Sequence, residues 1–349
     1  MMIFLNCRIS DVVIHRIGNK FEEGELEISE HPFSPEDEDL VTLMKDYFLS
    51  PFKREAYYNF VPIADEYINN PVYQAVDMIF SEKVHFYAQS IKIAEHLFEQ
   101  SNQPDIKQGD LYVTYFSDIQ TDDGTCDAVG IFKAETKDTF IKVFMNQGNT
   151  YQMQPDAGIN IKKLDKCCLI FNVNRENGYK VLIANKSNAK EAVYWQNDFL
   201  GLQPADDSYF QTTNYMNLCK DFVRDIYNNE NDVSKTDQID MLNRSMDFFK
   251  QTELFSEDSF IHEVVQQPEV IKAFENFKQQ YVQTNQVPLT NAFQISDYAV
   301  KDEKKYFKHV LKLDKNFHIY IHGLRKYIEK GYDTAKDMSF YKLFFREEE

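Results

Sequence analysis

The first hundred residues combine a β-branched segment with helical stripes. Residues 3–17 are rich in branched apolar side chains, which predicts a strand. Residues 34–37 then join a capping serine, a proline suited to the first helical turn and two acids, so we expect Ser34 to cap a helix that Pro51 ends. Asn70 and Pro71 repeat that start, and the region 35–101 is predicted to be helical.

From residue 109 the hydrophobic period changes to two or to continuous apolar runs. These runs indicate strands at 111–116, 128–132, 140–144, 168–171 and 181–184. Asn177-Gly178 separates the last two strands and favours a hairpin, because both positions tolerate a positive φ. We expect an antiparallel meander, and strands that follow a block of helices predict the α+β class.

Helical stripes return after residue 200. Ser234, Ser256 and Gln267-Pro268 suit helix starts, and a second β region is expected at 306–313, 317–321 and 340–345. A chain of 349 residues exceeds what one core usually organises. We therefore predict an N-terminal α+β domain over 1–200 and a C-terminal helical bundle over 201–349 that ends in a basic β-hairpin region.

The net charge of the chain changes sign near residue 301, well after the expected domain boundary at residue 200. Residues 1–300 carry 26 Lys and Arg against 47 Asp and Glu, a net charge of −21, whereas residues 301–349 carry 12 against 9, a net charge of +3. Without the last three glutamates, the segment 301–346 reaches +6. A basic segment on an acidic body predicts a polyanionic partner that is met through one face.

We interpret the basic segment as a β-ribbon suited to a phosphate backbone. Lys308 and Lys312 share a face of the expected strand with Tyr306. The hairpin partner carries His318, Tyr320 and His322 at alternate positions. The alternative is a solvated strand face, or a sheet edge that lysines protect from pairing. The candidate DNA contacts are Lys301, Lys304, Lys305, Lys308, Lys312, Lys315, Arg325 and Lys326, with a second cationic spot at Arg16 and Lys20 that exposed turn chemistry explains equally well.

Signals for chemistry are scarce. The sequence has no Walker loop, no Gly-x-Gly-x-x-Gly, no Gly-x-Ser-x-Gly and no His-Glu-x-x-His, so we expect no enzymatic activity, no metal centre and no cofactor. It also lacks a long uncharged apolar run and a signal-peptide pattern, which favours the cytoplasm. The odd number of cysteines, without a Cys-x-x-Cys pair, favours buried thiols at Cys7, Cys126, Cys167, Cys168 and Cys219.

One enzymatic alternative remains open. Asp127 and Glu135, if they lie on adjacent strands, could hold Mg²⁺, and Lys137 would share the face of Glu135. Nucleases of the PD-(D/E)-x-K type use that arrangement. Glu-x-Lys also arises by chance in a chain that is 27% charged, and residues 135–138 suit a simple turn.

Five stretches carry a resemblance to known proteins and together extend over nearly the whole chain. They are IHRIGNK at 14–20, YFLSPFK at 47–53, GDLYV at 109–113, AVGIFKAE at 128–135 and QISD at 294–297. None is a mechanistic motif. They resemble the bacterial nucleoid-associated protein family, particularly its members from the Bacteroidetes.

The resemblance implies a cytoplasmic protein found with the compacted chromosome, without catalytic residues to carry over. Our leading hypothesis is a structural protein that contacts DNA through the C-terminal basic ribbon. The second hypothesis is an adaptor that binds chromosomal proteins through its acidic surface, and the third is the nuclease. A homodimer would double the basic face without adding positive charge to each subunit.

Overall fold

The protein is described by a computed structural model of the whole chain. The described residues are 4, 6–35, 37–53, 56–121, 124–185, 193–231, 233–307, 310–314, 316–320 and 327–347. The chain divides into two compact units, Met1–Ala205 and Asp206–Glu349, each with hydrophobic clusters of its own. The α+β class expected from the sequence is confirmed.

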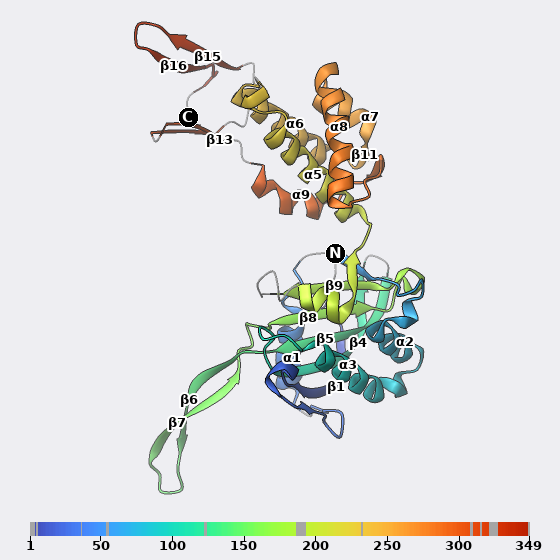
Figure 1. The fold of residues 1–349 in the computed structure, drawn as a ribbon. Coiled ribbons are helices and arrows are strands. Elements are labelled where there is room, and N and C mark those ends of the chain that lie inside the picture. Colours follow the sequence, from blue (N-terminus) through green and yellow to red (C-terminus); the bar gives the residue numbers. More distant parts are fainter. Residues whose placement is uncertain are drawn as a thin grey trace. The chain divides into compact units, whose positions relative to one another are not determined.

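An eight-stranded antiparallel sheet organises the N-terminal unit (Figure 1). Neighbouring strands follow the order β10-β3-β9-β8-β5-β4-β1-β2. The strands are β1 (Arg8–Ile17), β2 (Leu26–Glu27), β3 (Tyr57–Phe60), β4 (Gly109–Thr121), β5 (Gly124–Ala134), β8 (Lys166–Phe171), β9 (Lys180–Asn185) and β10 (Leu202–Pro204).

Helices cover both faces of this sheet. α2, α3 and the π-helix η5 pack on one face, and α1 packs on the other. The thiols of β8 show the alternation, because Cys168 lies in the first core and Cys167 in the second. Burial on both faces explains why β8 has a continuous apolar run. The helices of the unit are α1 (Glu38–Leu49), α2 (Pro71–Ser81), α3 (Phe86–Gln100) and η5 (Tyr194–Leu200), with short 3-10 turns η1 (Lys20–Glu22), η2 (Tyr67–Asn69), η3 (Lys83–His85) and η4 (Arg175–Asn177).

The helix starts depend on short polar side chains. Asn70 caps α2 as predicted, since its side-chain oxygen accepts hydrogen bonds from the N–H groups of Val72 and Tyr73. The predicted cap of α1, Ser34, is wrong. Asp37 caps that helix instead, because its carboxylate accepts the first free N–H groups of the helix and favours the positive end of the dipole.

The prediction of helix throughout 35–101 is wrong at β3. Tyr57 lies opposite Leu182 of β9, and Phe60 lies opposite Leu202 of β10. Both partners are far downstream in the chain, so a four-residue aromatic segment carried no local sign of its pairing.

The predicted hairpin of β8 and β9 is confirmed, but its connection is longer than a two-residue turn. The 3-10 turn η4 precedes Gly178, which has a φ of 86°. A Cβ atom at Gly178 would lie 2.6 Å from the carbonyl oxygen of Phe60. Glycine therefore suits both the left-handed backbone and the close approach of β3.

A two-stranded ribbon leaves the sheet between β5 and β8. It consists of β6 (Lys137–Met145) and β7 (Tyr151–Ile159), and Figure 1 shows it in green as a projection that we call the arm. The single meander predicted for residues 111–184 is wrong here, because β5 pairs directly with β8 and the arm pairs only with itself.

The C-terminal unit is a helical bundle with an aromatic core. Ser234 caps α6 as predicted by accepting the N–H of Asp237, and Pro268 occupies the first turn of α8. Phe255 stacks on Phe293 with ring centroids 4.5 Å apart. The elements are α5 (Ser208–Asp225), η6 (Asn229–Asn231), α6 (Lys235–Gln251), β11 (Leu254–Ser256), α7 (Glu257–Phe260), the π-helix η7 (Ile261–Val265), α8 (Pro268–Asn285), β12 (Ala292–Gln294), α9 (Asp297–Glu303) and η8 (Lys304–Tyr306).

Two hairpins follow in the C-terminal unit. β13 (Val310–Leu313) pairs with β14 (Phe317–Tyr320), and β15 (Ile328–Asp333) pairs with β16 (Met338–Leu343). Leu311 packs with Ile239 of α6, which fixes the first hairpin on the bundle. No helix among the described residues is long and apolar enough to cross a membrane.

Candidate nucleic-acid interface

The first basic residues of the C-terminal segment lie on a helix, where a strand or its approach was predicted. α9 begins after Ser296, whose hydroxyl accepts the N–H of Ala299, and it continues into η8. Buried Val300 and Phe307 hold this helical segment against the bundle. Tertiary packing of those apolar residues therefore keeps the chain helical up to residue 306, and the strand expected over 306–313 begins only at Val310.

Lys301, Lys304 and Lys305 lie at helical positions i, i+3 and i+4 and are exposed, so they share one side of the segment. We call these three residues the lysine face. Within the described part of the chain, none of the three ammonium groups forms an ion pair with a carboxylate. The lysine face is thus uncompensated positive charge on an acidic protein.

The acids of the same segment have other partners. Asp302 accepts a hydrogen bond of 2.9 Å from the hydroxyl of Tyr209, and Glu303 pairs with Lys220 of α5 at 2.7 Å. Both contacts direct these carboxylates toward α5. The local sequence KDEKK is nearly neutral, yet the fold separates its acids from its lysines.

Two tyrosines, which the sequence analysis did not include among the candidate DNA contacts, accompany the lysine face. The Lys301 ammonium lies 5.4 Å from the ring centroid of Tyr298, and that of Lys305 lies 4.8 Å from the ring centroid of Tyr306. Tyr306 is 54% exposed. Helical spacing of Tyr298 and Lys301 was the signal that could have linked them. Exposed aromatic rings beside cations suit contact with both phosphates and bases.

A cleft of about 590 Å³ between α5 and α6 adjoins Tyr306. Carboxylates compensate part of its positive charge, because Arg224 pairs with Asp221 at 2.7 Å and with Asp225 at 2.6 Å, whereas Lys235 donates to the side-chain oxygen of Gln238. Lys220 at the same cleft pairs with Glu303. The cleft is therefore a mixed-charge surface and adds little attraction for an anion.

The predicted ribbon exists in part. Lys312 lies opposite His318 and Val310 opposite Tyr320, so these positions share the face away from buried Leu311. Tyr320 is exposed on that face. Lys312 is described in its backbone alone, and the predicted contacts Lys308, Lys315, Arg325 and Lys326 lie outside the described residues.

The other cations named by the sequence analysis are paired. Arg16 lies 3.8 Å from Glu27, and Lys20 pairs with Glu99. Both belong to the N-terminal unit. In the second C-terminal hairpin, Lys342 pairs with Glu329 at 3.8 Å. Exposed pairs of this kind reduce the field that a distant polyanion meets.

The nuclease alternative does not form a site. Asp127 lies on β5 and Glu135 follows the end of the same strand, so eight residues at about 3.3 Å each place them roughly 26 Å apart. Asp127 accepts a hydrogen bond of 2.6 Å from the Tyr115 hydroxyl, and Lys137 pairs with Asp110 at 3.0 Å. The three residues therefore have separate partners.

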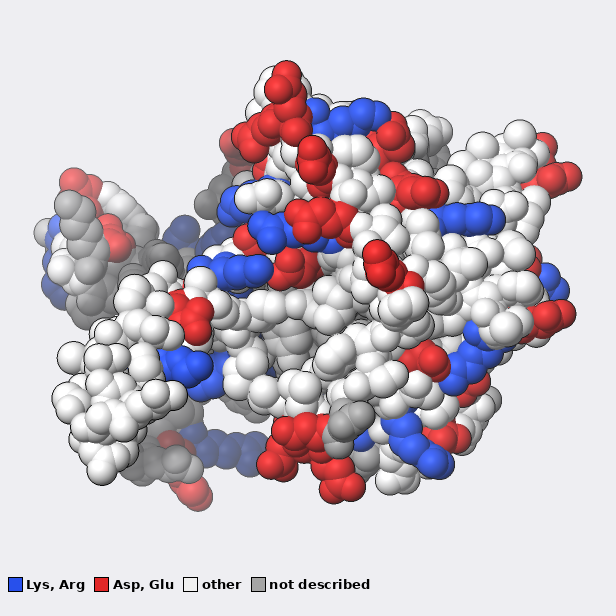
Figure 2. All heavy atoms as spheres, turned by 90° about the horizontal axis from the view of Figure 1, so that it is seen from below, with Lys and Arg blue, Asp and Glu red and all other residues white. Residues whose placement is uncertain are grey.

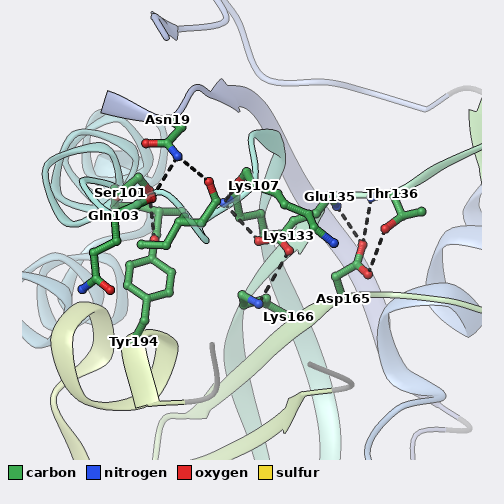
Figure 3. Close-up of polar contacts among 12 residues, drawn as sticks. Asn19, Ser101, Gln103, Lys107, Lys133, Glu135, Thr136, Asp165, Lys166 and Tyr194 are labelled. Carbon is green, nitrogen blue, oxygen red and sulfur yellow. Dashed lines mark hydrogen bonds and ion pairs between the residues drawn. The ribbon is translucent and has the colours of Figure 1, made fainter. Parts of the chain in front are cut away.

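Glu135 belongs to a buried ionic cluster, shown in Figure 3. Its carboxylate lies 3.1 Å from the ammonium of Lys133 and 3.6 Å from that of Lys166, and all three side chains are buried. Burial lowers the pKa of Lys133, and Glu135 opposes this shift. Two adjacent ammonium groups would also repel a divalent cation, so this glutamate is structural.

The same end of the sheet joins stretches that are distant in the sequence (Figure 3). The side-chain amide of Asn19 donates to the carbonyl oxygens of Gln103 at 2.9 Å and Ile106 at 2.7 Å. Asp165 accepts the N–H groups of Glu135 and Thr136. Residues 14–20 and 128–135, which carried the family resemblance, thus meet in one polar network that stabilises the N-terminal unit.

Comparison with protein families matches residues 13–338 to the nucleoid-associated protein YejK family. The chain belongs to this family. The match extends from β1 to the start of β16 and therefore includes both units. It confirms the resemblance drawn from the sequence and gives the chain a nucleoid-associated character. A comparison with curated proteins found no match.

Proposed function

We propose that this member of the nucleoid-associated family is a structural protein of the nucleoid that contacts DNA directly through its C-terminal unit. The observation that carries the proposal is the lysine face, three exposed lysines on one side of a helical segment without carboxylate partners among the described residues. Tyr298 and Tyr306 extend it with aromatic surface. Lysines that neutralise phosphates release counterions, which supplies the driving force.

The face of β13 and β14 with Lys312, His318 and Tyr320 follows the lysine face in the chain and extends the proposed contact. The remaining candidates, Lys308, Lys315, Arg325 and Lys326, belong to the same basic segment by sequence. Phosphate contacts of this kind position a protein on DNA without specifying the base sequence.

The acidic body restricts how DNA approaches. Residues 1–300 carry a net charge of −21, and screening at physiological salt extends over only about 8 Å. DNA that wrapped around the whole protein would be repelled. We therefore propose contact through one face, with weak binding that depends strongly on salt.

Charge reversal of the lysine face tests the proposal. The variant Lys301→Glu, Lys304→Glu, Lys305→Glu is compared with a control, Lys163→Glu, Lys250→Glu, Lys272→Glu, whose lysines are also exposed. Both variants lower the net charge of −18 by the same six units. Binding to duplex DNA is measured by fluorescence anisotropy over a series of salt concentrations.

We expect the first variant to lose most of its affinity and to reduce the slope of log K against log salt by roughly 2–3, since each phosphate contact contributes about 0.9. The control is expected to keep the slope of the unmodified protein. Equal losses in the two variants would mean that net charge alone matters, and unchanged binding of the lysine-face variant would contradict the proposal.

A second candidate is the adaptor, which the strongly acidic surface favours. Such a protein would reach the nucleoid by binding basic chromosomal proteins in place of DNA. Capture of nucleoid proteins that survives nuclease treatment, together with unchanged capture by the lysine-face variant, would favour the adaptor over direct DNA contact.

A further inference from the structure

The arm carries an apolar face that nothing in its own unit covers. In its register, Ile141 lies opposite Pro155, Val143 opposite Met153, and Met145 opposite Tyr151, so these six side chains share one face. The exposed fractions of Ile141, Tyr151 and Met153 are 69%, 71% and 74%. The face consists of Ile141, Val143, Met145, Tyr151, Met153 and Pro155.

The opposite face of the arm has a different composition. There Phe140 lies opposite Asp156, Lys142 opposite Gln154, and Phe144 opposite Gln152. Charged and amide side chains therefore alternate with aromatic rings. Only one side of the arm has the composition of a buried interface.

The arm is held in this conformation at both ends. At its base, Lys137 pairs with Asp110 at 3.0 Å and the Asn160 amide donates to Asp138 at 2.7 Å. At its tip, the side chain of Asn146 accepts the N–H groups of Gly148 and Thr150. An isolated two-stranded ribbon is marginal in water, so these anchors favour a function for the projection.

The apolar face is large enough to serve as a contact surface. Its five large apolar residues are 50–74% exposed and lie next to one another, which makes an apolar patch on the order of several hundred Å². Patches of this size on soluble proteins usually mark interaction sites. Figure 2 shows the arm at lower left as mostly white, while red and blue alternate over the body.

Charge decides which partner fits. The arm contains Lys137, Lys142, Asp138 and Asp156, a net charge of zero on a chain of net charge −18. DNA would need cations, but Lys137 is paired at the base and Lys142 lies on the other face. Two copies of the chain repel each other over most of their surface, and a neutral apolar face is where they can meet without opposing like charges.

We propose that the arm is the homodimerisation element of this protein, with the apolar faces of two arms packed on each other about a two-fold axis. Two such arms form a small sandwich with sheets about 10 Å apart, and the pair Val143 and Met153 lies at its centre. The contact is self-complementary, as a two-fold interface requires.

Two neighbouring residues of the arm provide a matched test. Met153→Glu places one charge on the apolar face, and Gln154→Glu places the same charge on the opposite face, across from Lys142. The mass of the full-length protein is measured by sedimentation equilibrium at micromolar concentration. Far-UV circular dichroism confirms that each variant is folded.

We expect the unmodified protein and Gln154→Glu to have twice the 41.2-kDa mass of the chain. Met153→Glu is expected to raise the dimer dissociation constant by at least about a hundredfold, because a charge buried in the interface has no partner. A third variant, Val143→Lys with Met153→Glu, pairs opposite charges across the ribbon and keeps the arm intact, and it should be monomeric too.

Amide hydrogen exchange gives an independent measurement. Exchange in residues 137–159 is expected to slow as the protein concentration rises in the unmodified protein and to be independent of concentration in Met153→Glu. A monomeric unmodified protein, or dimers that persist equally in all variants, would overturn the proposal. So would a Met153→Glu variant that keeps its mass but loses affinity for DNA, because the arm would then contact nucleic acid.

Discussion

Lysines in the two units have opposite surroundings. Lys133 and Lys166 of the N-terminal unit are buried and pair with Glu135, whereas the lysine face of the C-terminal unit is exposed and unpaired among the described residues. A buried ammonium group needs a partner inside the protein, because its desolvation is otherwise too costly. An exposed lysine remains solvated and available to an external anion. The position of a lysine in the fold therefore decides whether it stabilises the fold or can serve binding.

The largest effect is expected from breaking the buried cluster. Glu135→Gln removes the carboxylate that pairs with two buried ammonium groups and should lower the free energy of unfolding by about 3–5 kcal/mol. Urea unfolding followed by fluorescence measures this well, because the sole tryptophan, Trp195, is buried in the N-terminal unit. The control is Glu99→Gln, which removes the exposed partner of Lys20 and should cost at most about 1 kcal/mol. If both variants lost the same free energy of unfolding, buried and exposed lysines would not differ in their contribution to stability.

His15 is a buried base without a counter-charge among the described residues, and it should make the free energy of unfolding depend on pH. The Nδ1 atom of His15 accepts the N–H of Ser29, and burial lowers the pKa of His15 to about 4. Between pH 6.5 and about pH 4 the unfolded chain therefore binds a proton that the folded chain does not, so stability falls as the pH falls.

This loss amounts to about 3 kcal/mol over that window. His15→Gln should flatten the pH dependence of the unfolding free energy by that amount, whereas the exposed His31→Gln should leave it unchanged. Identical pH profiles for the two variants would show that His15 titrates normally in the folded state.

The smallest stability effect is expected at the lysine face. Changing Lys301, Lys304 or Lys305 to Gln should alter the free energy of unfolding by no more than about 0.5 kcal/mol each, because these side chains are exposed and unpaired within the described residues. The same change at Lys133 should cost several times more. Thermal unfolding of the four variants checks this, and a large destabilisation at the lysine face would assign it a structural role.

Local patterns predicted much of the fold because their causes are local. Asn70 and Ser234 cap their helices through neighbouring N–H groups, and the apolar runs of β4, β5, β8 and β9 pair as expected. β3 was missed because its partners lie far downstream. The strand expected over 306–313 begins only at Val310, because buried Val300 and Phe307 hold the residues before it in a helical segment.

The charge pattern of the sequence predicted where the candidate site lies, and tertiary contacts decided which of its charges remain unpaired among the described residues. The excess of lysines after residue 300 is visible in the sequence, but the contacts of Asp302 with Tyr209 and of Glu303 with Lys220 are not. Those contacts direct the acids toward α5 and leave Lys301, Lys304 and Lys305 without a carboxylate partner among the described residues. The same kind of contact places Arg16 beside Glu27 and weakens a cationic spot that the sequence predicted.

Composition and neighbours within a few residues are enough to predict the α+β class, most helices and strands, the charge asymmetry and the family resemblance. Contacts made in the folded protein are needed to bury Lys133 with Glu135, to make the lysine face helical, and to direct residues 137–159 out of the sheet as an arm with one apolar face. Those features depend on contacts between distant parts of the chain, for which the local pattern of a segment holds no information.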